Sequence, residues 1–193
     1  MEDNVRIGAE HEIAHALAYL AHGRPFVDVE VDGDGCGAVN ALRWAGRQDE
    51  VACIKMAGPA ADFAYLVNRD GEDRALETVV DGWRDLLGLT HPDDDPDAMS
   101  SDQAGAAGSG LMAFGFAWAA GFFVTNRALI KEFAGLLLEC GGRLSYADVA
   151  AVAEDRVRGA DQLEMVRVFG LLGPFSETVG AVEAHVQALQ AED

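Results

Sequence analysis

The sequence predicts a mainly α-helical domain with a small β-hairpin, or a single edge strand, after the first helix. Residues 4–22 are rich in helix-compatible side chains, and the first proline after them is Pro25. Residues 26–32 alternate with period two and are rich in valine, which is typical of a strand. Residues 104–124 contain no charged side chain, as expected of a helix at the centre of a domain. Half of all residues are hydrophobic, which is enough for a packed core.

The charge balance excludes several functions. The 193 residues include 33 acidic and 14 basic ones, and the formal net charge is −19. Such a surface repels phosphate backbones and anionic membranes, so nucleic-acid binding is not expected and neutral or basic polypeptides are the expected partners.

Cys36, Cys53 and Cys140 are odd in number and lack a C-x-x-C pair, which argues against a disulfide framework. The acidic first residues are not typical of a secretory signal, so a cytoplasmic protein is expected.

The most informative part of the first predicted helix is His11-Glu12-Ile13-Ala14-His15. Helix positions i and i+4 lie on one face, so the imidazoles of His11 and His15 can bind one metal ion. Glu12 lies beside them and can reach a water on that metal without being a ligand. This is the H-E-x-x-H arrangement of zinc metallopeptidases, with two zinc ligands and a general base. The alternative is a surface helix that carries these residues by coincidence.

A turn is predicted directly after the Val-rich strand. Residues 32–35 have turn composition, and residues 37–39 are expected to return as a second short strand. The two aspartates of this turn also suggest a calcium loop. However, Cys36 and Arg43 stand where an EF-hand needs oxygen ligands, so a hairpin turn is the prediction.

Two more helices are predicted before the middle of the chain. One covers residues 49–67, with an interruption or kink at Gly58-Pro59, and an amphipathic one covers residues 72–88. Residues 91–97 then form an acidic, proline-containing segment. A solvated linker is favoured there over a site for a hard cation.

The second half of the chain is predicted to be helical. Residues 104–124 are long enough to span a bilayer, but five glycines dilute their apolar character and the flanks lack a basic bias. A buried core helix is therefore favoured over a membrane span. An amphipathic helix over residues 125–140 is expected to follow. Ser145 is the expected N-cap of a helix that ends near residue 154, and a last helix is predicted near residues 175–190.

Several segments that follow the metal motif occur in a recognisable order. They are Gly23-Arg24-Pro25, the Val-rich strand, the glycine turn, Ile54-x-x-Ala57-Gly58-Pro59-Ala60-Ala61-Asp62, Ser101-Asp102-x-x-x-Ala106, and Asn126-Arg127-x-x-Ile130 through Val149. This order resembles the peptidase domain of the FtsH-type membrane AAA+ zinc proteases. In that family the metal helix leads to a substrate-side strand and an A/G-G-R-A-A-E helix. The resemblance covers residues 7–155 of a single domain, 1–193, in which residues 155–193 form a helical C-terminal extension.

The resemblance implies that Asp102, at the start of a helix, is the third zinc ligand. Because the stretch before Asp102 is longer than in the family, Glu77, Asp81 and His91 remain rival ligands. The alternative for Asp102 is a helix cap, formed together with the two serines that precede it.

Two residues of the motif also differ from the family pattern. Pro59 replaces the usual arginine, and Asp62 stands in place of glutamate. No P-loop motif occurs in the sequence, so any hydrolysis is expected to be independent of ATP. The family is usually hexameric, and a homo-oligomer is compatible with this resemblance.

Together, the motif and the resemblance imply a zinc metalloendopeptidase that cuts flexible or unfolded polypeptides, with Glu12 as the general base. If the 26–32 strand is an exposed edge, its residues Val27, Val29 and Val31 are expected to bind an extended peptide by strand addition. The alternative for this strand is structural packing.

Two other functional classes remain open. A catalytically silent domain of the same fold would serve as a protein-binding or regulatory module. Membrane anchoring through residues 104–124 is the weaker third hypothesis. The intact Glu12 favours catalysis, because a module freed from chemistry does not need a base at that position.

Overall fold

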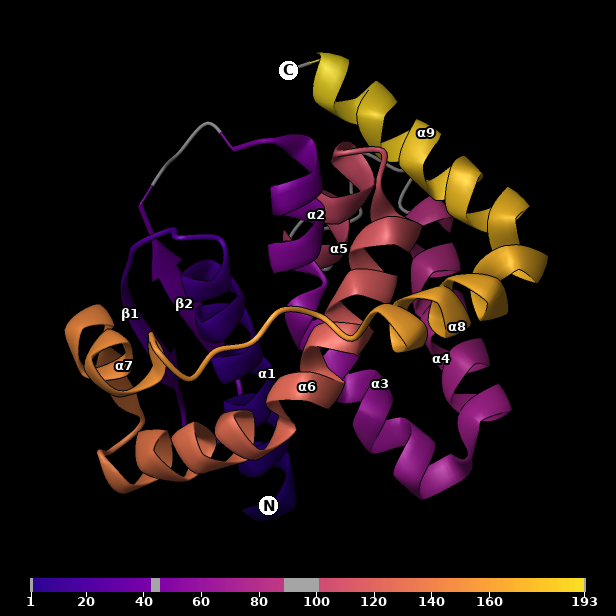
Figure 1. The fold of residues 1–193 in the computed structure, drawn as a ribbon. Helices are drawn as coiled ribbons and strands as arrows, with labels where there is room; N and C mark the ends of the chain where they lie inside the picture. The colour runs from indigo at the N-terminus through magenta and orange to yellow at the C-terminus, as the bar shows by residue number, and fades with distance from the viewer. Residues whose placement is uncertain (1, 43–45, 89–100, 193) are drawn as a thin grey trace.

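A computed structural model of the chain describes residues 2–42, 46–88 and 101–192, so the acidic segment 91–97, with His91, lies outside the described residues. The described part is mainly helical and contains one small antiparallel sheet, which confirms the predicted fold class (Figure 1). In chain order the elements are α1 (Glu2–Ala21), β1 (Phe26–Val31), β2 (Gly37–Ala41), α2 (Gln48–Lys55), α3 (Ala57–Asp70), α4 (Glu72–Gly88), α5 (Ser101–Gly108), α6 (Met112–Glu139), β3 (Arg143–Ser145), α7 (Tyr146–Ala153), α8 (Gln162–Leu172), a 3₁₀ turn (Gly173–Phe175) and α9 (Ser176–Glu192).

The sheet corrects the expectation of an edge strand over residues 26–32. Its strand order is β2-β1-β3, so β1 lies in the middle and pairs antiparallel with both neighbours, with Val29 opposite Val39 and Leu144. Val29 is fully buried and Val31 nearly so, whereas Val27, where the register between β1 and β2 shifts, is half exposed. The backbone of β1 therefore has no free edge for a substrate, and two of its three valines belong to the core. The edge strands of the described sheet are β2 and β3.

The predicted hairpin turn is confirmed between β1 and β2. The carboxylate of Asp32 accepts hydrogen bonds from the backbone N–H groups of Asp34 and Cys36, both at 2.9 Å. Gly35 has a φ of 89°, which a side chain would strain. The acidic side chain is thus used to close the turn, as aspartates commonly do.

Two of the predicted helices are each divided in the structure. The interruption predicted within 49–67 is confirmed, but it lies at Met56, between α2 and α3, and Pro59 lies in the first turn of α3, where its missing N–H needs no helical partner. The uncharged 104–124 segment is also two helices, because the chain turns between α5 and α6 at Gly110, whose φ is 69°. This second division was not predicted, because the turn lies within a continuous uncharged run.

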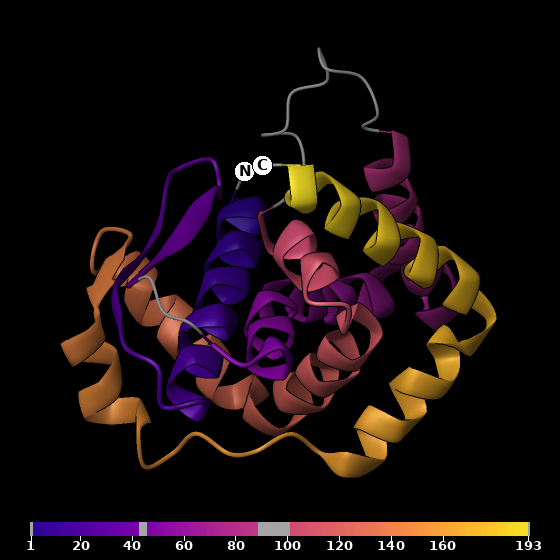
Figure 2. The same ribbon diagram turned by 90° about the horizontal axis from the view of Figure 1, so that it is seen from above.

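Two hydrophobic clusters form the core, and α6 passes through both. The first cluster joins α1, the sheet, the C-terminal half of α6 and α7; its largest members are Ile13, Leu17, Val29, Phe122, Ile130, Phe133 and Leu137. The second cluster joins α4, α5, the N-terminal half of α6, α8 and α9; its largest members are Met56, Trp83, Met112 and Phe116. Figures 1 and 2 both show the sheet and α7 on one side of the molecule and α4, α8 and α9 on the other.

Helix α6 is long and apolar enough to cross a membrane by length and composition alone. However, 61% of its most apolar window is buried inside the protein, as expected of a core helix. Its buried side chains contribute to both clusters. This agrees with the preference for a core helix in this region.

The C-terminal part contains both predicted and unpredicted elements. Ser145 is the N-cap of α7, as predicted, and its hydroxyl and the carboxylate of Asp148 form a capping box. The last predicted helix is α9, which packs on α4 and α5. The sequence does not predict β3 or α8. Helix α8 buries Val168 and Leu172 but exposes Leu163 and Val166, which obscures its apolar periodicity.

Replacing Asn126 with alanine is expected to destabilise the fold without touching the metal motif. Asn126 is buried, and its side chain bonds both the N–H and the carbonyl of Arg158, which ties the segment after α7 to α6. Loss of these bonds leaves buried groups unpaired and should lower the free energy of unfolding by about 2 kcal/mol, as measured by urea denaturation. Thr125→Ala, on the exposed neighbouring position, should change it by less than about 0.5 kcal/mol. Equal effects of the two variants would contradict this role of Asn126.

Candidate metal centre

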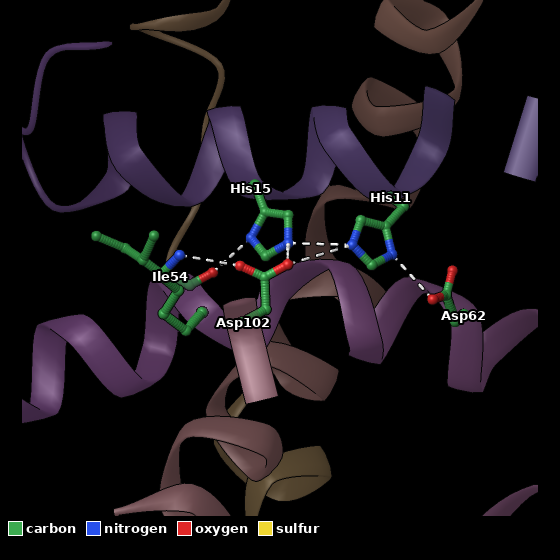
Figure 3. Close-up of polar contacts among 6 residues, drawn as sticks. His11, His15, Ile54, Asp62 and Asp102 are labelled. Carbon is green, nitrogen blue, oxygen red and sulfur yellow. Dashed lines mark hydrogen bonds and ion pairs between the residues drawn. The ribbon is translucent and has the colours of Figure 1, made fainter. Parts of the chain in front are cut away.

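Helix α1 places His11 and His15 one turn apart, and each ring is oriented by a hydrogen bond at Nδ1 (Figure 3). The Nδ1 atom of His15 donates to the carbonyl oxygen of Ile54 at 2.7 Å, and that of His11 donates to the carboxylate of Asp62 at 2.8 Å. These acceptors hold a proton on Nδ1 of each ring, so Nε2 is the atom that each ring offers to a metal ion. The two Nε2 atoms are only 3.2 Å apart and point to the same place.

The third group at this place is Asp102, in the first turn of α5. Its Oδ2 atom lies 3.1 Å from Nε2 of His15 and 3.7 Å from Nε2 of His11. Ligand atoms on a tetrahedral ion with bonds of 2.0–2.2 Å are about 3.4 Å apart, so this triangle has the size that such an ion requires. Among the described residues, His11, His15 and Asp102 form a group that could hold a metal ion. We call these three residues the triad.

Gly58, in the first turn of α3, provides an independent test of the site. A Cβ atom at this position would overlap Nε2 of both His11 and His15, the two atoms that face the metal position. The backbone of α3 therefore approaches the imidazoles as closely as a glycine permits. The space beside the triad depends on the absence of a side chain here, which fits a site that has to admit an ion.

The charges around the triad are strongly coupled. Burial alone lowers the pKa of His11, but hydrogen bonding to Asp102 and Asp62, together with the charges of Asp62 and Glu12, raises it to about 10. Burial alone raises the pKa of Asp102, but the charges of His15 and Lys55 and the hydrogen bonds of both imidazoles hold it well below its usual range. Asp102 is thus ionised, as a metal ligand must be, and the site has a strong affinity for positive charge.

No protein-family model matches this chain, and no curated protein matches it either.

Glu12 shares a pocket of about 100 Å³ with the triad members His15 and Asp102. Glu12 is 8% exposed, and burial raises the pKa of its carboxyl above the ordinary value, although the positive charges of His15 and His11 oppose this shift. A carboxyl that takes up a proton more readily than usual suits general-base work near neutral pH. In addition, the chain at Gly37 packs against Glu12, because a Cβ there would overlap the glutamate side chain.

The two rival carboxylates do not reach the triad. Glu77 is exposed on α4, and Asp81 on the same helix pairs with Arg84 at 2.6 Å. The third rival, His91, lies outside the described residues. Of the carboxylates weighed from the sequence, Asp102 is the one that the fold brings to the two histidines.

Four groups of the site were not assigned a role from the sequence. The carbonyl of Ile54 and the carboxylate of Asp62 orient the imidazoles, Gly58 leaves room beside them, and Lys55 pairs with Asp102 at 3.1 Å. Ile54, Gly58 and Asp62 are specified positions of the motif that carries the family resemblance, but their contacts were not predicted, and Lys55 is an unspecified position of the same motif. For Lys55 the sequence contains no signal, because a single lysine on a helix is usually solvated.

Proposed function

We propose that this protein is a zinc-dependent metallopeptidase of the kind that the FtsH-type resemblance implies. The observation that carries the proposal is the convergence of three metal-ligand groups, His11, His15 and Asp102, beside a pocket that is lined by the last two and by the buried carboxyl of Glu12. Two imidazoles and one carboxylate suit zinc, and catalytic zinc sites typically have three protein ligands and one open position.

The proposed mechanism assigns a separate task to each group of the chain. A bound zinc ion would polarise the scissile carbonyl and lower the pKa of a coordinated water. Glu12 accepts the proton as the water attacks the carbonyl carbon, and it later delivers that proton to the departing amine. Asp62 and the carbonyl of Ile54 hold the Nδ1 proton of each imidazole and so direct Nε2 at the site, where a metal ion would displace any second proton.

The substrate is proposed to bind at β2 in place of β1. Gly37, Ala38 and Val39 line the same pocket as Glu12, and β2 has a free edge within the described sheet. An extended polypeptide added to this edge would make main-chain hydrogen bonds beside the catalytic carboxyl. Recognition through the main chain suits flexible or unfolded polypeptides with little side-chain selectivity.

Metal analysis combined with a cleavage assay tests the proposal. The purified protein is expected to contain about one zinc per chain and to hydrolyse an unfolded casein-type substrate without ATP. Zinc without hydrolysis would instead support the protein-binding module. The absence of any bound metal after zinc loading would contradict both the ligand set and the mechanism.

Lys55 is expected to position Asp102 for metal binding. Its ammonium group contacts Oδ1 of Asp102 at 3.1 Å, which leaves Oδ2 as the oxygen that faces the imidazoles, and its stem packs against Gly105. Lys55→Met should weaken zinc binding about tenfold, as changes to such supporting groups do, measured by competition with a chelator. Lys55→Arg, which keeps the charge, should recover part of the affinity. Unchanged zinc affinity in Lys55→Met would argue against this positioning role.

A further inference from the structure

A second pocket lies between α1, α3 and α6, on a different face of α1 from the metal pocket. Its volume is about 250 Å³. On α1 it is lined by Arg6, Ile7 and Glu10, which recur at the spacing of one helix face. The pocket and the metal centre use neighbouring residues of the same two helices, because Glu10 precedes the ligand His11 and Ala61 precedes Asp62, which orients that histidine.

This pocket concentrates positive charge in a strongly acidic protein. Three of the 14 basic residues line it, namely Arg6 on α1 and Arg127 and Lys131 on α6. Neither Arg127 nor Lys131 forms an ion pair with any residue in the described ranges. Two acidic residues, Asp3 and Glu10, also line the pocket, and Glu10 pairs with Arg6 at 3.4 Å. Two cations in a chain of net charge −19 are thus left available to an anion.

The lower part of the pocket is apolar. Phe123 is 4% exposed and Ala61 is 5% exposed, so both form a floor beneath the charged rim, and Tyr65 adds an aromatic wall. An occupant that satisfies all of these groups has an apolar body and an anionic head. The guanidinium of Arg127 presents paired donors that match a carboxylate.

We propose that this pocket binds an organic carboxylate with a single apolar side chain, of the kind that ends a polypeptide chain. The volume lies below that of pockets for drug-sized ligands and suits one residue. A polypeptide held by its last residue would leave the pocket beside the metal centre, since both sites lie on α1 and α3. Only this last step rests on the proposed peptidase function, whereas binding of the carboxylate does not.

Calorimetric titration with N-acetylphenylalanine and with its amide tests the proposal. The titrated protein carries Glu12→Gln, so that no substrate is consumed and failure to bind is distinct from failure to hydrolyse. The acid is expected to bind at least tenfold more tightly than the amide. In the Arg127→Ala/Lys131→Ala variant the affinity for the acid should fall at least tenfold. Arg74→Ala, an exposed cation on α4 outside the pocket, should leave it unchanged.

Two peptides identify the source of the carboxylate. A decapeptide that ends in phenylalanine with a free carboxyl group should bind more tightly than N-acetylphenylalanine if the ligand is a polypeptide terminus, and about equally if it is a small carboxylate. Its C-terminal amide should bind weakly in either case. Equal binding of acid and amide, or unchanged affinity for the acid in the double variant, would overturn the proposal.

Discussion

Glu12→Gln is expected to lower peptide hydrolysis by about 10³-fold while leaving about one zinc per chain. The amide has nearly the shape of the carboxyl but cannot accept the proton of the attacking water. Because Glu12 lines the pocket and is not one of the three metal-facing groups, zinc binding should survive the substitution. Cleavage of a casein-type substrate and elemental analysis of the same preparation measure the two effects separately.

Glu77→Gln is the matched control for this experiment. Glu77 is an exposed glutamate on α4 that the sequence left open as a third ligand, and the fold holds it apart from the triad. Its replacement should change neither the zinc content nor the rate. Retained activity in Glu12→Gln would remove the proposed base from the mechanism, and loss of zinc in Glu77→Gln would reopen the ligand assignment.

Gly58→Ala is expected to weaken zinc binding by about 100-fold or more, which corresponds to about 2.7 kcal/mol. The added methyl group would overlap Nε2 of both His11 and His15, so at least one imidazole has to move away from the metal position. Competition with a chelator measures the affinity. Far-ultraviolet circular dichroism shows whether the helices remain, and we expect them to remain, since alanine is a better helix former than glycine.

Gly135→Ala separates the local clash from a general effect of losing a glycine. Gly135 is an exposed position within α6, and a Cβ there meets no atom within 4 Å. This variant should bind zinc as the unmodified protein does and should be more stable by about 0.5–1 kcal/mol. If Gly58→Ala also keeps full zinc affinity, the imidazoles do not define the metal position as proposed.

The part of the site carried by one helix could be predicted from the sequence. The spacing of His11 and His15 fixes their relation as soon as the helix forms, because helix geometry is local and regular. The hairpin turn and the cap at Ser145 were predictable for the same reason, since each depends on contacts within a few residues. The position of Asp102 followed only from the family resemblance.

The features that were missed depend on packing between distant segments. Strand β3 is three residues long and pairs with β1 across more than a hundred residues, so nothing near it signals that β1 becomes the central strand. The break at Gly110 lies within a stretch of small and apolar residues that carries no charge to mark a helix end. The contact between Lys55 and Asp102 exists only because α2 and α5 pack together. Such long-range pairings are set by the whole fold.

The two clusters described above divide the triad between them. His11 and His15 belong to a helix of the first cluster, whereas Asp102 belongs to α5, whose Ala106 and Ala107 are buried in the second. A cation that binds all three ligands therefore acts as a cross-link between the two halves of the core, in addition to serving the chemistry. By linkage, any change that loosens the docking of one half against the other also lowers the affinity for the ion, even at residues far from the ligands. Occupancy of the metal site is thus a thermodynamic reporter of how firmly the two halves hold together.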